Sequence, residues 1–229
     1  MRGRDIEILV LDDAEAAARE TAERLGAAAR AGAQLALTGG STPRRAYELA
    51  ATVEPDWSRA GAWWGDERCV PPDDERSNYR LARESLLDRL ARPPAVHRIR
   101  GELEPEEAAA AYERELDGTR LDLVLLGIGP DGHVASLFPD APTLRERERR
   151  VVAAAPGLEP FVERVTLTVP ALRAAGAILF LVTGAEKADA ARAAFVEEPS
   201  ERTPSSLVRA DSGESLAILD GAAAARLEA

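Results

Sequence analysis

Residues 121–139 read LDLVLLGIGPDGHVASLFP, and this stretch decides the fold class. Its first six residues are apolar except for Asp122, without the alternation of a half-exposed strand. Such a run is typical of a central parallel strand that is covered on both faces. Glycines and a proline then allow the chain to turn sharply. The stretch therefore predicts an α/β protein with a turn at the carboxyl end of a buried strand, where such proteins bind their ligands.

The turn carries Asp131 and His133, and three interpretations of it are open. The glycines of residues 127–132 match a dinucleotide fingerprint, but Pro139 cuts the next segment short, whereas that fold needs a long helix and a later acidic residue. The same residues could form a plain turn with a surface histidine. In the third interpretation, His133 is a general base that a neighbour such as Asp131 orients. The other histidine, His97, has no motif around it and is expected to be structural or exposed.

Strand and helix patterns alternate along the rest of the chain. Strand patterns cover residues 6–11, 34–37, 61–64, 97–99, 164–169, 177–182 and 216–219. Helix patterns cover residues 13–31, 43–51, 78–90 and 105–116, a short segment after Pro170, a segment at Lys187 and the Ala-rich tail. No internal repeat or low-complexity linker divides the 229 residues. The pattern predicts a single doubly wound, Rossmann-like domain over residues 1–229 with a mainly parallel sheet.

The composition, 45% hydrophobic and 30% charged, is that of an ordinary soluble globular protein. A net charge of −11 argues against nucleic acid as a partner, and the lack of about 18 consecutive apolar residues argues against a membrane span. The N-terminal residues lack the apolar core of a signal peptide, and the single Cys69 excludes an intrachain disulfide. A cytoplasmic location is therefore expected, with Cys69 as a small buried residue rather than a nucleophile.

A phosphate site is predicted after the strand at residues 34–37, where the chain continues as TGGSTP, residues 38–43. The glycines expose backbone N–H groups, the hydroxyls add donors, and the N-terminus of the next helix adds positive potential. The Gly-Lys-Ser/Thr ending of a P-loop is missing, and a capped helix after a plain glycine turn remains the alternative. The candidate phosphate-binding residues are Gly39, Gly40, Ser41 and Thr42.

Charged residues also follow the strand at residues 61–64, which contains two tryptophans. A solvated loop is the ordinary interpretation of Asp66, Glu67 and Arg68, but a buried strand before them places them at the rim of the sheet. Lys187 is the only lysine of the chain and lies in the first turn of an expected helix. Its charge is unfavourable with the helix dipole there, so an anion that compensates it is expected.

Three motifs, in this order, resemble 6-phosphogluconolactonases, which belong to a wider group with glucosamine-6-phosphate deaminases. They are LTGGSTPRRAYE, WWGDERCVPPDDERSNY and LVLLGIGPDGHVASLFP, and the resemblance runs from Thr38 to the strand at Leu216. It implies hydrolysis of 6-phospho-D-glucono-1,5-lactone to 6-phosphogluconate in the oxidative pentose phosphate pathway, without a metal or another cofactor. The implied partner is a small-molecule sugar-phosphate lactone, and the family's habit favours a monomer.

The resemblance also implies a role for each candidate residue. The phosphate is held by the glycine loop and by two later cations: Gly39, Gly40, Ser41, Thr42, Arg164 and Lys187. His133 is the general base that takes a proton from water. As a hypothesis for the mechanism, Asp131 orients its imidazole as the carboxylate of a triad does, but the sequence leaves open whether Asp131, Asp66 or neither contacts it. Asp66, Arg68 and Asp131 line the sugar ring, and Arg68 or N–H groups of the glycine turn stabilise the oxyanion.

Two rival functions remain. Glucosamine-6-phosphate deaminases are similar but carry a glutamate that supports the histidine, and the aligned position here is Phe138, which favours the lactonase. A non-catalytic sugar-phosphate sensor is disfavoured because nothing in the sequence resembles a DNA-binding helix-turn-helix extension. The sensor is also disfavoured because Asp131, His133, Arg164 and Lys187 are all present.

Overall fold

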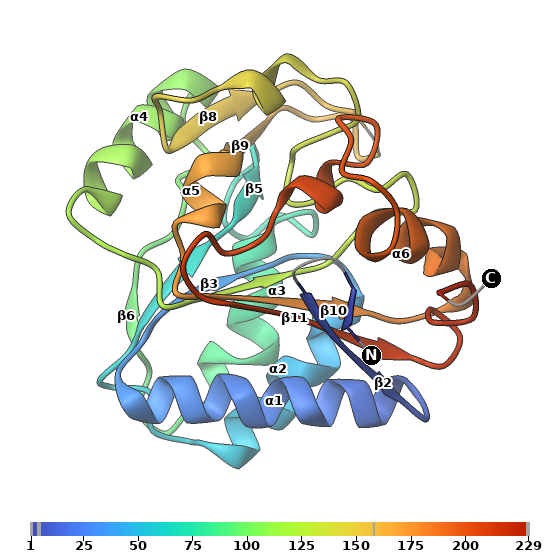
Figure 1. The fold of residues 1–229 in the computed structure, drawn as a ribbon. Coiled ribbons are helices and arrows are strands. Elements are labelled where there is room, and N and C mark those ends of the chain that lie inside the picture. The colour runs from blue at the N-terminus through green and yellow to red at the C-terminus, as the bar shows by residue number, and fades with distance from the viewer. Residues whose placement is uncertain (1, 4–5, 158, 228–229) are drawn as a thin grey trace.

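The computed structural model describes residues 2–3, 6–157 and 159–227, and its centre is an eight-stranded sheet (Figure 1). The strand order is β1-β2-β11-β10-β7-β3-β4-β6. Neighbouring strands from β2 to β6 are parallel, and β1 pairs with β2 in the antiparallel direction. The strands are β1 Arg2–Gly3, β2 Ile6–Leu11, β3 Gln34–Leu37, β4 Gly61–Trp64, β6 Ala95–Val96, β7 Leu123–Leu126, β10 Ala177–Val182 and β11 Glu214–Asp220.

The predicted central strand is confirmed as β7, which lies between β10 and β3. Its register places Leu123 beside Ala177 of β10 and Val124 beside Ala36 of β3. Val124, Leu125 and Leu126 are buried because the sheet is covered on both faces. The predicted α/β class with a mainly parallel sheet is therefore confirmed.

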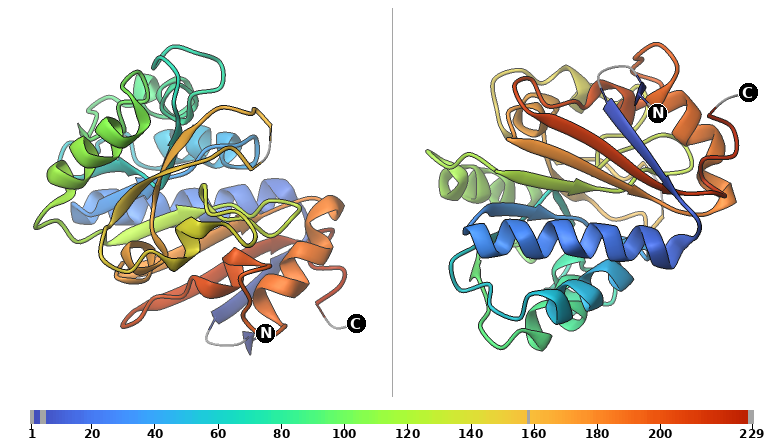
Figure 2. Two further views of the ribbon diagram at one scale, coloured as in Figure 1. Left: turned by 90° about the horizontal axis from the view of Figure 1, so that it is seen from above. Right: turned by 60° about the horizontal axis from the view of Figure 1, so that its bottom comes forward.

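Helices cover the two faces of this sheet (Figures 1 and 2). Helices α1 and α2 pack on one face and on each other, and α6 lies on the opposite face. The Asp13 carboxylate caps α1 by accepting a 2.8 Å hydrogen bond from the Ala16 N–H, and Gly32 ends it. Among the described residues, no helix is long and apolar enough to cross a membrane. The helices are α1 Ala14–Ala31, α2 Thr42–Val53, α3 Asn78–Ser85, α4 Pro105–Leu116, α5 Val169–Arg173 and α6 Ala188–Phe195.

A second, three-stranded antiparallel sheet was not expected from the sequence. It consists of β5 Asp66–Arg68, β9 Arg164–Leu167 and β8 Val151–Ala154, with β9 in the middle. The charged residues at 66–68 were expected at the rim of the main sheet, but they form a strand of this second sheet. Helix α4 packs against β8 and β9, so the second sheet has its own covered face. Three charged residues carry no strand pattern, and β5 forms because β9 supplies its hydrogen-bonding partners.

Several predicted elements differ from the structure. The strand expected at 97–99 is instead β6, Ala95–Val96, and α3 ends at Ser85 before a 3-10 turn, Leu87–Arg89. β9 ends at Leu167, because the Thr168 hydroxyl accepts the Ala171 N–H and starts α5. The helix expected in the Ala-rich tail is wrong: residues 221–227 form turns. A segment this short does not nucleate a helix without strong packing.

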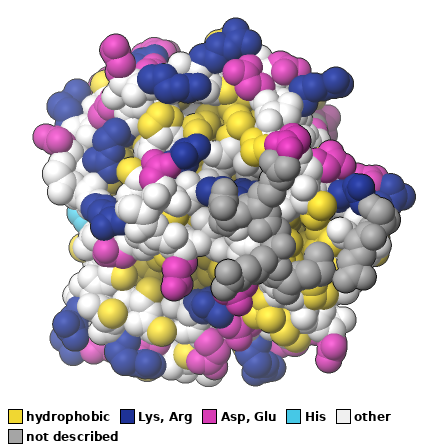
Figure 3. Space-filling model, in the orientation of Figure 1, with side chains coloured by type: hydrophobic (Ala, Val, Ile, Leu, Met, Phe, Trp, Pro, Cys, Tyr) yellow, Lys and Arg dark blue, Asp and Glu magenta, His cyan; other side chains and the backbone are white. Residues whose placement is uncertain are grey.

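Acidic and basic side chains are interspersed on the surface shown in Figure 3. Charged side chains of the described residues form many ion pairs, such as Arg145 with Glu201 at 3.0 Å and Arg173 with Asp211 at 2.5 Å. Exposed pairs of this kind contribute at most about 1 kcal/mol each, so the buried core supplies most of the stability.

Candidate active site

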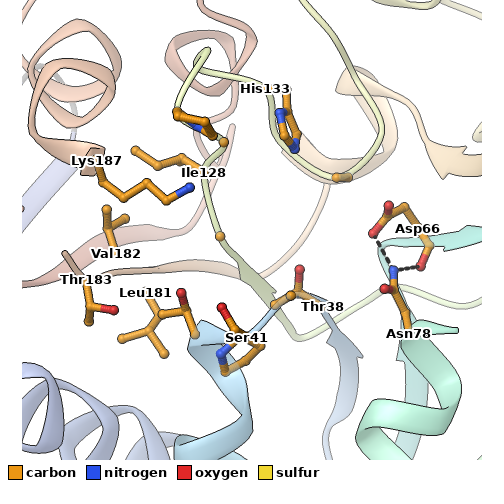
Figure 4. Close-up of a pocket in the computed structure, with 18 of the residues that line it drawn as sticks. Thr38, Ser41, Asp66, Asn78, Ile128, His133, Leu181, Val182, Thr183 and Lys187 are labelled. Atoms are coloured by element: carbon orange, nitrogen blue, oxygen red, sulfur yellow. Dashed lines mark hydrogen bonds between the residues drawn. The ribbon is translucent and has the colours of Figure 1, made fainter. Parts of the chain in front are cut away.

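A cavity of about 280 Å³ opens at the carboxyl ends of β3, β7 and β10 (Figure 4). Residues that follow these three strands form one part of its wall, and the second sheet forms another. Every candidate site residue except Asp131 lines this cavity: Gly39, Gly40, Ser41, Thr42, Asp66, Arg68, His133, Arg164 and Lys187. The topology therefore brings together the loops that the sequence separates, as expected for ligand sites of parallel sheets.

The loop after β3 presents polar groups to the cavity from the N-terminus of α2. Ser41 is the N-cap residue of α2, but its hydroxyl makes no capping hydrogen bond and is available to a ligand. Gly40 has a φ of 91°, a conformation that favours glycine. Gly39 is required for another reason, because a Cβ there would overlap the amide of Asn78. A helix N-terminus of this kind favours a bound anion.

His133 lines the cavity, and the Asp131 carboxylate contacts its imidazole ring. Asp131 Oδ1 is 2.6 Å from His133 Nδ1 and also accepts the His133 backbone N–H at 3.2 Å. Burial raises the pKa of the Asp131 carboxyl, but the hydrogen bond and charge of His133 outweigh it, so the net shift is downward. Asp131 was also expected to line the sugar ring. Asp131 is not among the residues that line this cavity, so its contact with a sugar ring stays a prediction.

Phe138 packs against His133 on the cavity side. The two ring centroids are 4.9 Å apart, and the rings are tilted by 45°. The Arg164 guanidinium also lies over the Phe138 ring, 5.5 Å from its centroid. The histidine therefore contacts a carboxylate, that of Asp131, and an aromatic ring, that of Phe138, which stands where the resemblance to deaminases would call for a glutamate.

The second sheet contributes two arginines to the cavity wall, one from each of two neighbouring strands. Arg68 of β5 is directly opposite Arg164 of β9. Burial, and then the charge of Arg68, lower the pKa of Arg164. Arg68 donates to the Arg76 carbonyl at 2.6 Å, while its buried Nε has no hydrogen-bond partner among the described residues. Arg164 was grouped with Lys187 by sequence, but the structure places it beside Arg68.

Lys187 approaches the cavity from the carboxyl end of β10, and its ammonium group points into the cavity (Figure 4). It does not lie in the first turn of a helix as predicted, but ends the 3-10 turn Ala185–Lys187 and is the N-cap residue of α6. Burial lowers the pKa of Lys187, and the carboxylates of Glu186 and Asp131 oppose this shift. A partly desolvated ammonium beside a helix N-terminus gains from a bound anion.

Asp66, Asn78 and Ser136 form a buried hydrogen-bonded group beside the cavity. Asn78 Nδ2 donates to the Asp66 carbonyl at 2.9 Å and to Asp66 Oδ1 at 3.1 Å (Figure 4). The Ser136 hydroxyl donates to Asp66 Oδ2 at 2.6 Å. The sequence analysis placed Asn78 only at the start of an expected helix and did not single out Ser136. Asn78 lies in the same sequence motif as Asp66, and this position could have indicated it. Its hydrogen bonds to Asp66, however, can be seen only in the folded structure.

Glu67 points away from the cavity and caps α3. Its carboxylate accepts hydrogen bonds from the backbone N–H groups of Asn78, Tyr79 and Arg68 and from the Ser77 hydroxyl. Burial raises its pKa to about 7, although these backbone hydrogen bonds act in the opposite direction. Glu67 therefore connects the strand that carries Asp66 and Arg68 to the helix that carries Asn78.

The surroundings of Cys69 and His97 indicate structural rather than catalytic roles. Burial raises the pKa of the Cys69 thiol to about 11, so this half-buried side chain stays a thiol at neutral pH and is a poor nucleophile. His97 stacks on Trp63 with ring centroids 4.0 Å apart and contacts Glu115 at 2.8 Å. Among the described residues, no group of three or more His, Cys, Asp or Glu side chains could hold a metal ion.

Comparison with known proteins identifies the family. The family model described as glucosamine-6-phosphate isomerases/6-phosphogluconolactonase matches residues 12–217. The chain belongs to this isomerase/lactonase family. Within it, a 6-phosphogluconolactonase from Homo sapiens is 41% identical over 211 residues, covering 86% of this chain and 82% of the human protein. A 6-phosphogluconolactonase from Streptomyces coelicolor is 36% identical, covering 96% of this chain and 94% of that protein.

The isomerase/lactonase family is also evident in solved structures. The 6-phosphogluconolactonase from Trypanosoma cruzi superimposes with a TM-score of 0.86 at 28% identity, covering 100% of this chain and 99% of that one. Because the family model names two activities, family membership alone does not decide between them, and the cavity residues must do so.

Proposed function

We propose that this chain hydrolyses 6-phospho-D-glucono-1,5-lactone to 6-phosphogluconate, the lactone-opening step of the oxidative pentose phosphate pathway. The observation that carries the proposal is the position of His133, which lines the cavity while Asp131 engages its Nδ1. Nε2 is then the ring nitrogen left for a water molecule. The printed names of the human and Streptomyces relatives support the same reaction.

In this proposal the phosphate binds between the loop of Gly39 and Ser41 and the Lys187 ammonium group. The N-terminus of α2, the uncapped Ser41 hydroxyl and Lys187 supply donors from two sides. Arg164 adds positive charge from the second sheet. Burial lowers the pKa of Lys187 and of Arg164, so a phosphate that pairs with them restores favourable charge interactions in the cavity.

The chemical step then proceeds from a water molecule on Nε2 of His133. Nε2 takes a proton from this water as its oxygen forms a bond to C1 of the lactone, and the carbonyl electron pair moves onto the carbonyl oxygen. When the oxyanion collapses, the bond between C1 and the ring oxygen breaks, and the imidazolium returns its proton to that oxygen. Asp131 stabilises the imidazolium between these two proton transfers.

Arg68 is the proposed stabiliser of the oxyanion. Its positively charged side chain lines the cavity. A charged donor that is already in place when negative charge develops lowers the barrier more than one that must reorganise. Asp66, held by Asn78 and Ser136, accepts a hydrogen bond from a sugar hydroxyl.

The lactonase is favoured over the deaminase because Phe138 packs on His133 where a deaminase needs a carboxylate. An aromatic ring cannot take part in the proton transfers of sugar ring opening. The proposal further includes a monomer acting in the cytoplasm, which light scattering of the purified protein and cell fractionation would test.

The test of function is lactone opening. The lactone is generated in place by glucose-6-phosphate dehydrogenase, and its hydrolysis is followed for the wild type, His133→Gln and His97→Gln. We expect fast opening by the wild type, a decrease in kcat of about 10²–10⁴-fold for His133→Gln with little change in KM, and near wild-type turnover for His97→Gln. His97 is a matched control because it stacks on Trp63 outside the cavity.

Two outcomes would overturn the proposal. Opening by the wild type no faster than the buffer blank would exclude the lactonase activity, and ammonia release from glucosamine 6-phosphate would then support the rival. Similar turnover by wild type and His133→Gln would exclude His133 as the base.

A further inference from the structure

The Asp66 carboxylate is held from two different elements. Its Oδ1 accepts from Asn78 Nδ2 at 3.1 Å, and its Oδ2 accepts from the Ser136 hydroxyl at 2.6 Å. All three side chains are buried, with exposed fractions of 5% for Asp66, 1% for Asn78 and 0% for Ser136. Asp66 nevertheless lines the cavity. One donor on each oxygen fixes the plane of the carboxylate and leaves each oxygen able to accept a second hydrogen bond.

Ser136 belongs to the loop that carries His133. Its backbone N–H donates to the Thr166 hydroxyl at 3.2 Å, and its own hydroxyl donates to Asp66. Thr166 is in β9 and Asp66 is in β5, where the two are paired in register. Ser136 therefore connects the His133 loop to the second sheet by one hydrogen bond to β9 and one to β5.

The backbone beside Ser136 is strained. Ala135 has a φ of 50°, in the left-handed region that non-glycine residues seldom adopt. Such a conformation persists only where the surroundings determine it, and it occurs often at functional sites. Here Val134 and Leu137 bridge across it, with the Leu137 N–H donating to the Val134 carbonyl at 2.9 Å, and Ser136 adds the two bonds to the second sheet.

We propose that Ser136 is a positioning residue, which orients the Asp66 carboxylate toward a substrate hydroxyl and holds the His133 loop in register with the second sheet. This inference rests on the proposed function, because it assigns Asp66 and His133 to one bound substrate. Ser136 itself does not line the cavity, so it acts through Asp66 and through the loop.

The matched pair of variants is Ser136→Ala and Ser85→Ala. Ser85 is also fully buried, and its hydroxyl donates to the Leu81 carbonyl at 2.6 Å, but it lies in α3 outside the cavity lining. Both variants lose one buried hydroxyl and are expected to lose thermal stability. Ser136→Ala should lower kcat/KM for lactone opening by about 10- to 100-fold, with a raised KM and a lowered kcat. Ser85→Ala should stay within about twofold of the wild type.

A double-mutant cycle distinguishes positioning from a general loss of structure. If Ser136 acts through Asp66, then Ser136→Ala should lower kcat/KM by a much smaller factor in an Asp66→Asn background than in the wild type. Calorimetric binding of 6-phosphogluconate should show the same non-additivity. If Ser136→Ala does not fold, Ser136→Cys replaces it in the cycle. Because S–H is a weaker donor than O–H, kcat/KM should still fall several-fold in this variant.

Additive effects in the cycle, or unchanged kcat/KM for Ser136→Ala, would overturn the inference. So would wild-type kcat/KM for Ser136→Cys, where that variant replaces an unfolded Ser136→Ala. Different outcomes would exclude the proposed function and the positioning role of Ser136. A wild type that does not open the lactone but shows non-additive binding of 6-phosphogluconate excludes the proposed function and supports the positioning role. A wild type that opens the lactone with additive effects excludes only the positioning role.

Discussion

Arg68 lies directly opposite Arg164 in the antiparallel pairing of β5 with β9, and both side chains line the cavity. Like charges directly opposite each other on neighbouring strands destabilise a sheet. Burial and the charge of Arg68 together lower the pKa of Arg164, which is the expected sign of this repulsion. We therefore expect a bound anion to stabilise the second sheet.

An anionic ligand should accordingly raise the thermal stability, and Arg164 should account for part of the effect. At about 100 times its Kd, 6-phosphogluconate should add about 2.7 kcal/mol to the free energy of unfolding, or about 5–10 °C in Tm. In Arg164→Gln the shift at the same ligand concentration should fall below about half. Arg173→Gln is the control, because Arg173 is an exposed residue paired with Asp211. Equal shifts in both variants would contradict the anion site at Arg164.

Asp131→Asn should lower kcat much more than it changes KM. The carboxylate that contacts His133 Nδ1 at 2.6 Å stabilises the imidazolium, and an amide cannot. A loss of about 10²–10⁴-fold in kcat is expected, measured against the spontaneous opening rate. Asp122→Asn is the matched control, since Asp122 accepts the Gln34 N–H at the opposite end of β7. A wild-type kcat in Asp131→Asn would exclude a role for this carboxylate.

Lys187 should make substrate binding sensitive to alkaline pH. Burial lowers the pKa of its ammonium group, so it loses its charge at a lower pH than an ordinary lysine. KM should therefore rise as the pH is raised toward and through this lowered pKa, because the phosphate loses a charged partner. Lys187→Arg keeps its charge at these pH values and should flatten the rise. A KM profile that is the same in Lys187→Arg and the wild type would assign the rise to another group.

Glu67 should make stability depend on pH between about 4.5 and 7. Its pKa is about 7 in the folded protein against 4.5 for an ordinary glutamate, so the folded state holds this proton more tightly. Its contribution is full below pH 4.5 and is lost as the pH rises through 7, a change of about 3 kcal/mol. Urea unfolding of Glu67→Gln across this window should show a flatter profile than the wild type.

Above about pH 7, where Glu67 is ionised, the same variant should be less stable than the wild type by about 1–3 kcal/mol, and at lower pH this difference should grow by the pH-dependent contribution of Glu67. A glutamine amide places an N–H group among the donors that Glu67 accepts, so one backbone N–H at the start of α3 loses its partner. Glu107→Gln, an exposed change on α4, is the control and should change neither the profile nor the stability by more than about 0.5 kcal/mol. A profile for Glu67→Gln that is as steep as that of the wild type would assign the pH dependence elsewhere.

Several features of the fold could be predicted because they depend on neighbours in sequence. The apolar run at residues 121–126 indicated a strand buried on both faces, and β7 lies between β10 and β3. The helix pattern at residues 13–31 is confirmed as α1, whose ends depend on local features, the capping hydrogen bond of Asp13 and the left-handed conformation of Gly32. The short Ala-rich tail was predicted wrongly, because helix propensity alone does not stabilise so few residues.

The sequence by itself determined the chemical groups of the site and which of them lie close along the chain. Asp131 and His133 are two positions apart, so a tight glycine turn is enough to bring them together. Only the tertiary structure decided that Arg68 lies opposite Arg164 in the strand pairing and that Ser136 holds Asp66 across 70 positions of sequence. These contacts depend on a second sheet whose strand β5 is three charged residues long. Such a strand has no local preference for its conformation and is stabilised only by the strand beside it.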